Sequence, residues 1–280
     1  NATGMKVLCD REKLREGLAV ANSVIPTKST KPVLSNVCLV ATGDALELVG
    51  TDLDVAVRFR IEDVKVGEPG TTVIPARVAS DFVRDLSGET VQLESKDGKC
   101  TITAGSDSCD LVTVDPDEFP VVARFEEKGS VALQGGTFTK LVSRTAFAAA
   151  KEQGRYAMHG VLTEIEEGVL RMVATDGRRL AVAFAPIDVD EGPNRPVIVP
   201  TKGMQLFCRV ISDPLDQIRL SFDDNQIGIR TRNAEVFARL LDGDFPRYQA
   251  VIPGEAAHSV EADSDLLTRK IRVVANVTGD

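Results

Sequence analysis

The stretch Leu46-Glu-Leu-Val-Gly-Thr51-Asp52 recurs later in the chain as Leu170-Arg-Met-Val-Ala-Thr175-Asp176. Further landmarks follow in the same order, Val73-Ile-Pro75 before Phe119-Pro120 in one half and Val197-Ile-Val-Pro200 before Phe245-Pro246 in the other. The lag grows only from 124 residues between Thr51 and Thr175 to 126 residues between Phe119 and Phe245. A lag of this size exceeds the period of solenoid repeats and matches a domain, so the sequence predicts a duplicated domain.

A third copy begins near the end of the sequence, because Gly129-Ser130-Val131 reappears as His258-Ser259-Val260. We therefore expect one domain over 5–127, a second over 128–254, and only the start of a third over 255–280. The four residues before Met5 are expected to be an added remnant outside the fold.

The composition bounds the class of protein. No apolar run is long enough to cross a bilayer, which predicts a cytoplasmic protein without a membrane partner. The five cysteines lack CxxC spacing and only two histidines are present, so no metal site, cofactor or catalytic site is expected. The net charge of −9 argues against nucleic acid as a partner, unless the basic residues are gathered on one surface.

Each copy has the same predicted order of elements. A helix opens it, over Arg11 to Ile25 and Thr137 to Gln153, and a second helix follows a proline, over Arg77 to Leu86 and Lys202 to Ser212. Short alternating strands with hairpin-length connections lie between and after the helices, for example Val91 to Glu94 and Gln226 to Thr231. This order predicts the α+β class with antiparallel sheets.

The predicted helices gather the positive charge on their polar faces. The stripes contain Arg77 and Arg84 in one helix, Lys140, Arg144 and Lys151 in another, and Lys202 and Arg209 in a third. A single basic stripe is typical of an ordinary solvated face. Its recurrence on matching helices of an acidic protein instead favours a shared cationic surface that contacts phosphates without reading bases.

Specific motifs accompany the repeat. The run Thr175-Asp176-Gly177-Arg178-Arg179-Leu180-Ala181-Val182, together with Asp242-Gly-Asp-Phe245-Pro246-Arg-Tyr248, resembles the bacterial sliding clamps, the beta subunits of DNA polymerase III. The resemblance runs from Met5 to the end of the sequence. It implies repeated domains of the clamp fold, with sheets outside and helices lining a central hole, and a head-to-tail homodimer ring of full-length subunits. Such a ring encircles duplex DNA without sequence preference and gives a polymerase its processivity.

The resemblance also implies two sets of site residues. The residues that would face DNA are Lys28, Arg77, Arg84, Lys140, Arg144, Tyr156, Lys202 and Arg209. A groove for short peptides rich in Gln, Leu and Phe, from the replicative DNA polymerase, the clamp loader and repair factors, would contain Arg155, Met158, Thr175, Gly177, Arg178, Arg179, Leu180, Pro246 and Val251. Arg178 stands where some relatives carry His and Met158 where Leu is common, so the groove should have a more cationic rim.

Two other classes of function compete with the clamp. Paired carboxylates such as Asp52 with Asp54 can bind Mg²⁺ or act as acid and base, but they lie in predicted turns, where Asp is favoured for its backbone hydrogen bonds. A multi-domain interaction scaffold without DNA binding is the closer alternative. It would require that the basic stripes be dispensable for retention on DNA.

Overall fold

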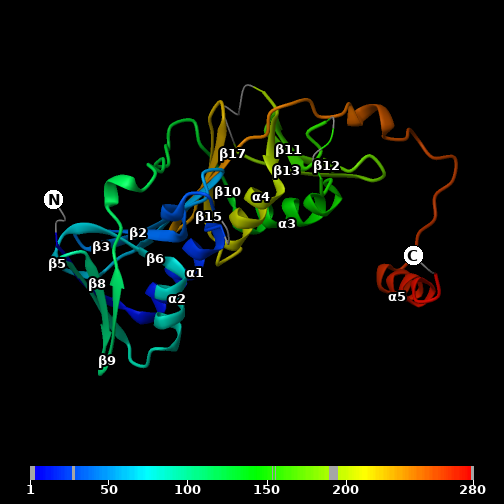
Figure 1. Ribbon diagram of the computed structural model, residues 1–280. Coiled ribbons are helices and arrows are strands. Elements are labelled where there is room, and N and C mark those ends of the chain that lie inside the picture. The colour runs from blue at the N-terminus through cyan, green and yellow to red at the C-terminus, as the bar shows by residue number, and fades with distance from the viewer. Residues whose placement is uncertain (1–3, 27–28, 153, 155, 189–194, 279–280) are drawn as a thin grey trace. The chain divides into compact units, whose positions relative to one another are not determined.

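The computed structural model describes residues 4–26, 29–152, 154, 156–188 and 195–278, and divides the chain into two units, Asn1–Phe245 and Pro246–Asp280. The first unit contains both copies of the repeat, each built in the predicted order (Figure 1). The predicted α+β class with antiparallel sheets is confirmed.

The first copy is built of the following elements: β1 (Met5–Asp10), α1 (Arg11–Val24), the 3₁₀ helix η1 (Pro32–Ser35), β2 (Asn36–Thr42), β3 (Ala45–Thr51), β4 (Val55–Ile61), β5 (Lys65–Glu68), β6 (Gly70–Pro75), α2 (Ala76–Asp85), β7 (Thr90–Lys96), β8 (Lys99–Ala104), β9 (Asp107–Val112) and the 3₁₀ helix η2 (Pro116–Glu118).

The second copy repeats this order with these elements: β10 (Val131–Gln134), α3 (Gly135–Thr145), the 3₁₀ helix η3 (Ala146–Ala148), β11 (Gly160–Glu166), β12 (Val169–Thr175), β13 (Leu180–Pro186), β14 (Val197–Pro200), α4 (Thr201–Arg209), β15 (Gln217–Phe222), β16 (Gln226–Arg230) and β17 (Ala234–Arg239).

One sheet joins the two copies. Its strand order is β10-β15-β16-β17-β4-β3-β2-β6, and β17 of the second copy pairs antiparallel with β4 of the first, with Val236 opposite Val57. Two further sheets, β5-β1-β7-β8-β9 and β13-β12-β11-β14, belong to one copy each. The pairing of β4 with β17 therefore joins the two copies through one continuous hydrogen-bonded sheet.

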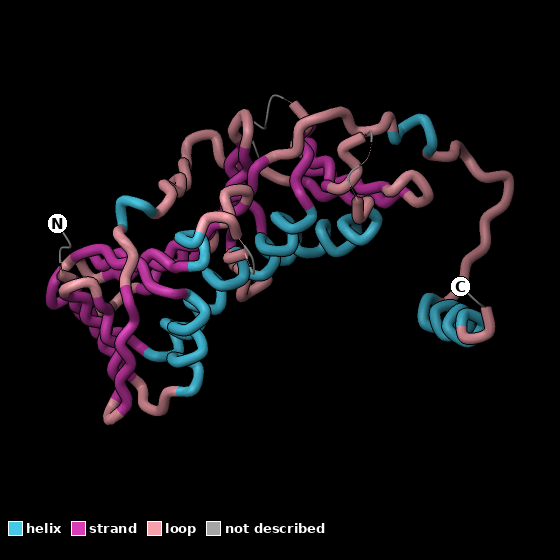
Figure 2. The backbone as a smooth tube through the Cα atoms, in the orientation of Figure 1, coloured by secondary structure: helices cyan, strands magenta, loops and turns pink. Residues whose placement is uncertain are grey.

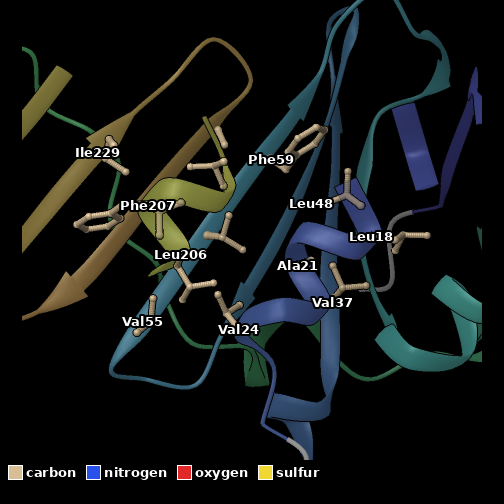
Figure 3. Close-up of a cluster of buried hydrophobic side chains, with 14 of the residues drawn as sticks. Leu18, Ala21, Val24, Val37, Leu48, Val55, Phe59, Leu206, Phe207 and Ile229 are labelled. Atoms are coloured by element: carbon tan, nitrogen blue, oxygen red, sulfur yellow. The ribbon is translucent and has the colours of Figure 1, made fainter. Parts of the chain in front are cut away.

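The core is shared in the same way. Figure 3 shows Val24 and Val55 of the first copy in one cluster with Leu206 and Phe207 of the second. Phe207 is fully buried and its ring lies 6.2 Å from that of Phe138. Burial also raises the pKa of the Cys9 and Cys100 thiols to about 12, in keeping with their predicted place inside the fold.

The four helices of the first unit cover one side of the sheets. Figure 2 shows α1 to α4 in a row, with the strands on their other side, and contacts of α1 with α2 and α4 continue the row across the two copies. Each helix buries an apolar stripe, such as Ala79 and Val83 in α2, and leaves its polar stripe exposed. The predicted basic stripes thus lie on one side of the unit.

Two helices end earlier than predicted. The opening helix of the second copy ends at Thr145, whose hydroxyl donates back to the carbonyl of Leu141 at 2.8 Å, and a 3₁₀ turn follows. Lys151, placed by the sequence pattern in the helical stripe, consequently lies beyond the helix. The other helix ends at Arg209 rather than Ser212, and Ile211 and Pro214 belong to the following loop.

The second unit contains η4 (Tyr248–Val251) and α5 (Ser264–Ala275) in the part that the structure describes. Asp263 caps α5 by accepting a hydrogen bond from the amide of Leu266 at 2.7 Å. The predicted helix around Leu266 and Leu267 is confirmed, whereas Val260 lies in no strand, unlike Val131, its counterpart in β10.

Candidate functional site

The turn between β12 and β13 carries most of the predicted groove residues. The hydroxyl of Thr175 donates to the carbonyl of Arg179 at 2.7 Å and accepts the amide of Gly177 at 3.1 Å. Gly177 has a φ of 85°, a left-handed conformation that glycine adopts without a steric penalty. This turn brings Thr175, Gly177, Arg178, Arg179 and Leu180 together.

Asp176 fixes the same turn from the other side. Its Oδ1 accepts the amides of Arg178 at 3.0 Å and Arg179 at 3.1 Å. These backbone hydrogen bonds, followed by the nearby Arg179 guanidinium, hold the pKa of the Asp176 carboxyl below its usual value. The carboxylate form is therefore the one that organises the turn.

Phe147 belongs to this site although it is not among the predicted groove residues. The Arg179 guanidinium donates to the carbonyl of Phe147 at 2.7 Å and lies 5.5 Å above the centre of its ring. Phe147 is exposed because it follows the end of α3 and points away from the core. The signal in the sequence was that Phe147 interrupted the stripe of a helix that in fact ends before it.

Met158 is hydrogen-bonded to the segment that follows Phe147. Its carbonyl accepts the amide of Ala150 at 2.8 Å, just beyond η3, and its side chain is half-buried. The neighbouring Tyr156 and His159 line a cavity of about 280 Å³ together with Leu241 to Gly243. Within the described residues, the buried Nδ1 atom of His159 has no hydrogen-bond partner.

Three predicted groove residues do not belong to the described part of the first unit. Pro246 and Val251 belong to the second unit, where Pro246 is half-buried and Val251, at the end of η4, is 68% exposed. Arg155 lies outside the described residues. The structure thus brings together the part of the predicted groove that belongs to the first unit.

The predicted DNA-facing cations are exposed on the helices. Arg77 and Arg84 lie on α2, Lys140 and Arg144 on α3, and Lys202 and Arg209 on α4. Neither α3 nor α4 contains an acidic residue, although the whole chain has a net charge of −9. Lys28 lies outside the described residues, and Tyr156 is partly exposed after α3.

Two of these cations are engaged in ion pairs. Arg84 binds Asp81 at 2.8 Å and Asp85 at 3.1 Å, and Lys202 donates from Nζ to Oδ2 of Asp52 in the other copy. In the described part of the chain, no ion pair involves Arg77, Lys140, Arg144 or Arg209. The positive charge that no carboxylate neutralises therefore lies mainly on α3 and α4.

The competing carboxylate pairs serve as turn residues. Oδ1 of Asp52 accepts the amides of Asp54 at 3.0 Å and Val55 at 2.7 Å, and Asp115 accepts the amide of Asp117. Among the residues that the structure describes, no group of three or more His, Cys, Asp or Glu side chains could hold a metal ion. None of the helices described is long and apolar enough to cross a membrane.

Comparison with known proteins gives a consistent result. Residues 5–123 match the family of the DNA polymerase III beta subunit N-terminal domain, and residues 132–247 match the family of its central domain. The beta sliding clamp of Escherichia coli K12 is 32% identical over 264 residues, which cover 94% of this chain and 72% of that protein. The beta sliding clamp of Pseudomonas putida is 31% identical with the same coverage.

Solved structures agree with the sequence comparison. The C. crescentus beta sliding clamp has a TM-score of 0.91 and 30% identity, covering 99% of this chain and 76% of that one. The Pseudomonas aeruginosa sliding clamp bound to griselimycin has a TM-score of 0.85 and 31% identity, covering 91% of this chain and 69% of that one.

Proposed function

The chain belongs to the bacterial DNA polymerase III beta sliding clamp family, and from that membership we propose which of its surfaces meet DNA and partner proteins. A beta clamp confers processivity on the polymerase and has no catalytic role, so this chain acts as a clamp and not as an enzyme. The alternative of a scaffold without DNA binding receives no support from the relatives.

The helical side of the first unit faces duplex DNA. The observation that carries this assignment is the set of exposed cations without ion pairs in the described chain, Lys140 and Arg144 on α3 and Arg209 on α4, joined by Arg77 on α2. Point charges on helices contact phosphates without reading base edges, which suits a protein that slides. Tyr156 and Lys28, of which Lys28 lies outside the described residues, are assigned to the same surface. Arg84 and Lys202 contribute less because carboxylates already bind them.

The turn of Thr175 to Leu180 forms one wall of a groove for partner peptides. Gly177 gives the turn its shape, Leu180 and Met158 supply apolar contact area, and Arg179 stacked on Phe147 forms the rim. The P. aeruginosa relative was solved with griselimycin bound, which supports a ligand site on a clamp of this fold. Pro246, Val251 and Arg155 are assigned to the same groove, and its ligands are Gln/Leu/Phe-rich peptides of the replicative polymerase, the clamp loader and repair factors.

The sheet edges suggest how a ring closes. β9 occupies in the first copy the position that β17 occupies in the second, and β17 pairs with β4. β9 ends its sheet with an exposed backbone edge, and so does β13, the counterpart of β4. The same antiparallel pairing, repeated at these edges, would join copies and subunits head to tail into a homodimer in the cytoplasm, where the chromosome lies.

A charge-reversal experiment tests the DNA assignment. Arg144→Glu combined with Arg209→Glu is expected to weaken binding to a labelled duplex roughly tenfold or more and to reduce its salt dependence. Arg232→Glu combined with Lys96→Glu, at two exposed positions outside the helices, makes the same change in net charge. An equal loss in this double control would contradict the assignment, since it would reflect net charge alone.

A further inference from the structure

The turn that precedes β4 in the first copy repeats the groove turn of the second copy bond for bond. The hydroxyl of Thr51 donates to the carbonyl of Val55 at 2.9 Å and accepts the amide of Leu53 at 2.9 Å. Oδ1 of Asp52 accepts the following two amides, as Oδ1 of Asp176 does in the second copy. The repeat has therefore preserved the geometry of the turn as well as its Thr-Asp sequence.

Leu53 stands where the second copy has Gly177. Its φ of 81° is close to the 85° of Gly177, but a leucine in this left-handed region is strained. Its side chain is 50% exposed and belongs to neither hydrophobic cluster, so it gains little from burial. A strained, exposed apolar side chain indicates a role other than stabilising the fold.

Leu53 lies at a cavity of about 350 Å³ at the junction of the two copies, here called the first-junction pocket. Thr51, Leu53 and Pro120 line its first-copy side, and Gln226, Phe237 and Arg239 of β16 and β17 line its second-copy side. By the repeat, Thr51 corresponds to Thr175 and Pro120 to Pro246. The positions assigned to the peptide groove thus recur at the first junction.

The walls of the first-junction pocket are held in place. Arg58 donates to the carbonyls of Val122 at 2.6 Å and Ala123 at 2.9 Å, which fixes the segment that carries Val121. Val122 and Phe237 are buried together in a small cluster beneath it, while Val121 is 100% exposed. A preformed recess of this size, lined by both polar and apolar residues, accepts one anchor side chain at little cost in ordering.

The charges of the two sites differ. Asp54 replaces Arg178 and Val55 replaces Arg179, so the arginine rim of the second-copy turn is missing at the first junction. The charged residues that line the pocket are Asp54 and Arg239. Asp54 directly follows Leu53 and takes the place of Arg178, so a basic or neutral residue beside the anchor suits this turn, while Arg239 lies on the second-copy side of the pocket. An acidic residue suits the arginine rim of the second copy instead.

We propose that the first-junction pocket is a second docking site for a short extended peptide, which inserts one aliphatic or aromatic side chain and carries a basic or neutral residue beside it. The class of ligand rests on the peptide groove proposed above, but the pocket is built by different residues. A clamp with both sites could hold two partners that differ in the charge next to their anchors.

The test uses two fluorescent pentapeptides, acetylated and amidated, of sequence Gln-Leu-Lys-Leu-Phe and Gln-Leu-Glu-Leu-Phe, titrated with the whole chain. Leu53→Gly and Val121→Ser should each weaken binding of the lysine peptide about fivefold or more and leave the glutamate peptide unaffected. Arg179→Ala should show the opposite pattern. Val260→Ser, at a position that is 93% exposed and outside both sites, is the matched control and should change neither affinity.

Urea unfolding of the variants separates binding from folding. Leu53→Gly should not lower the unfolding midpoint, because glycine adopts the same φ without strain. The proposal is overturned if the lysine peptide fails to bind, or if its affinity is insensitive to both Leu53→Gly and Val121→Ser. An insensitivity of the glutamate peptide to Arg179→Ala would instead count against the groove in the second copy.

Discussion

Lys202 lies on the helical face assigned to DNA, yet its ammonium group donates to Asp52 of the other copy. Asp52→Asn keeps an acceptor at Oδ1 for the two backbone amides and removes the charge that holds Lys202. The freed lysine should strengthen binding to duplex DNA and steepen the log–log salt dependence by up to about one. Salt titrations of the affinity for a labelled duplex measure both.

Asp44→Asn is the matched control, because it removes one negative charge from an exposed turn without releasing a lysine. If both variants strengthen binding equally, Lys202 makes no specific contribution.

Individual site residues were predictable where they are adjacent in the sequence. Thr175 to Leu180 are contiguous, so a recognised motif located the whole turn, in which Gly177 takes the left-handed conformation. The pairing of Lys202 with Asp52 was not predictable, because 150 positions separate them and only the packing of two copies joins them. Phe147 was missed because the end of α3 depends on a local hydrogen bond of Thr145.

At the scale of elements, Glu47 on β3 binds Arg124 and so attaches the segment that connects the two copies to the sheet. Its carboxylate is 10% exposed and binds Arg58 at 3.3 Å, Arg60 at 3.4 Å and Arg124 at 3.1 Å. Burial disfavours the charged form, but the hydrogen bonds and charge of Arg124, with the charges of Arg58 and Arg60, outweigh it and lower the pKa of Glu47.

A lowered pKa of Glu47 makes the fold sensitive to acid. Its contribution to stability is fully present above the value of about 4.5 in the unfolded chain and disappears as the pH falls through the lower folded value. Glu47→Gln should therefore destabilise the protein at neutral pH, by about 2–4 kcal/mol because Arg58 loses its buried counter-charge, and should flatten the loss of stability in acid. Urea unfolding midpoints measured at several pH values check both effects.

Glu62→Gln provides the control, because Glu62 also binds Arg60 but is well exposed. A loss of stability in Glu62→Gln as large as that in Glu47→Gln would show that the buried cluster contributes no more to stability than an exposed ion pair.

The elements themselves were largely predictable. The positions and order of the helices follow from apolar periodicity, and α1 and α2 match their predicted ranges to within a residue at each end. Both helices of the second copy were predicted to be too long, because Lys151 and Ile211 fit the helical periodicity although the helices end at Thr145 and Arg209. Which strands pair across the copies is not encoded in any local pattern.

At the scale of the whole molecule, the two copies should unfold as one. The eight-stranded sheet crosses from β17 to β4, and a single cluster of buried residues contains side chains of both copies. Calorimetry should show one transition for residues up to Phe245, with a van't Hoff enthalpy close to the calorimetric one. Two separated transitions of similar enthalpy would mean that the copies fold independently despite the shared sheet.

The central claim is that this chain works as a topological clamp on DNA. The most direct measurement loads the full-length protein onto nicked circular DNA with a clamp loader, at a salt concentration that screens phosphate contacts, and then linearises half of the sample. Retention on the circles with rapid loss from the linear molecules is the result that a closed, sliding ring predicts. Equal loss from both forms would contradict it, because retention by ring closure depends on whether the DNA has ends.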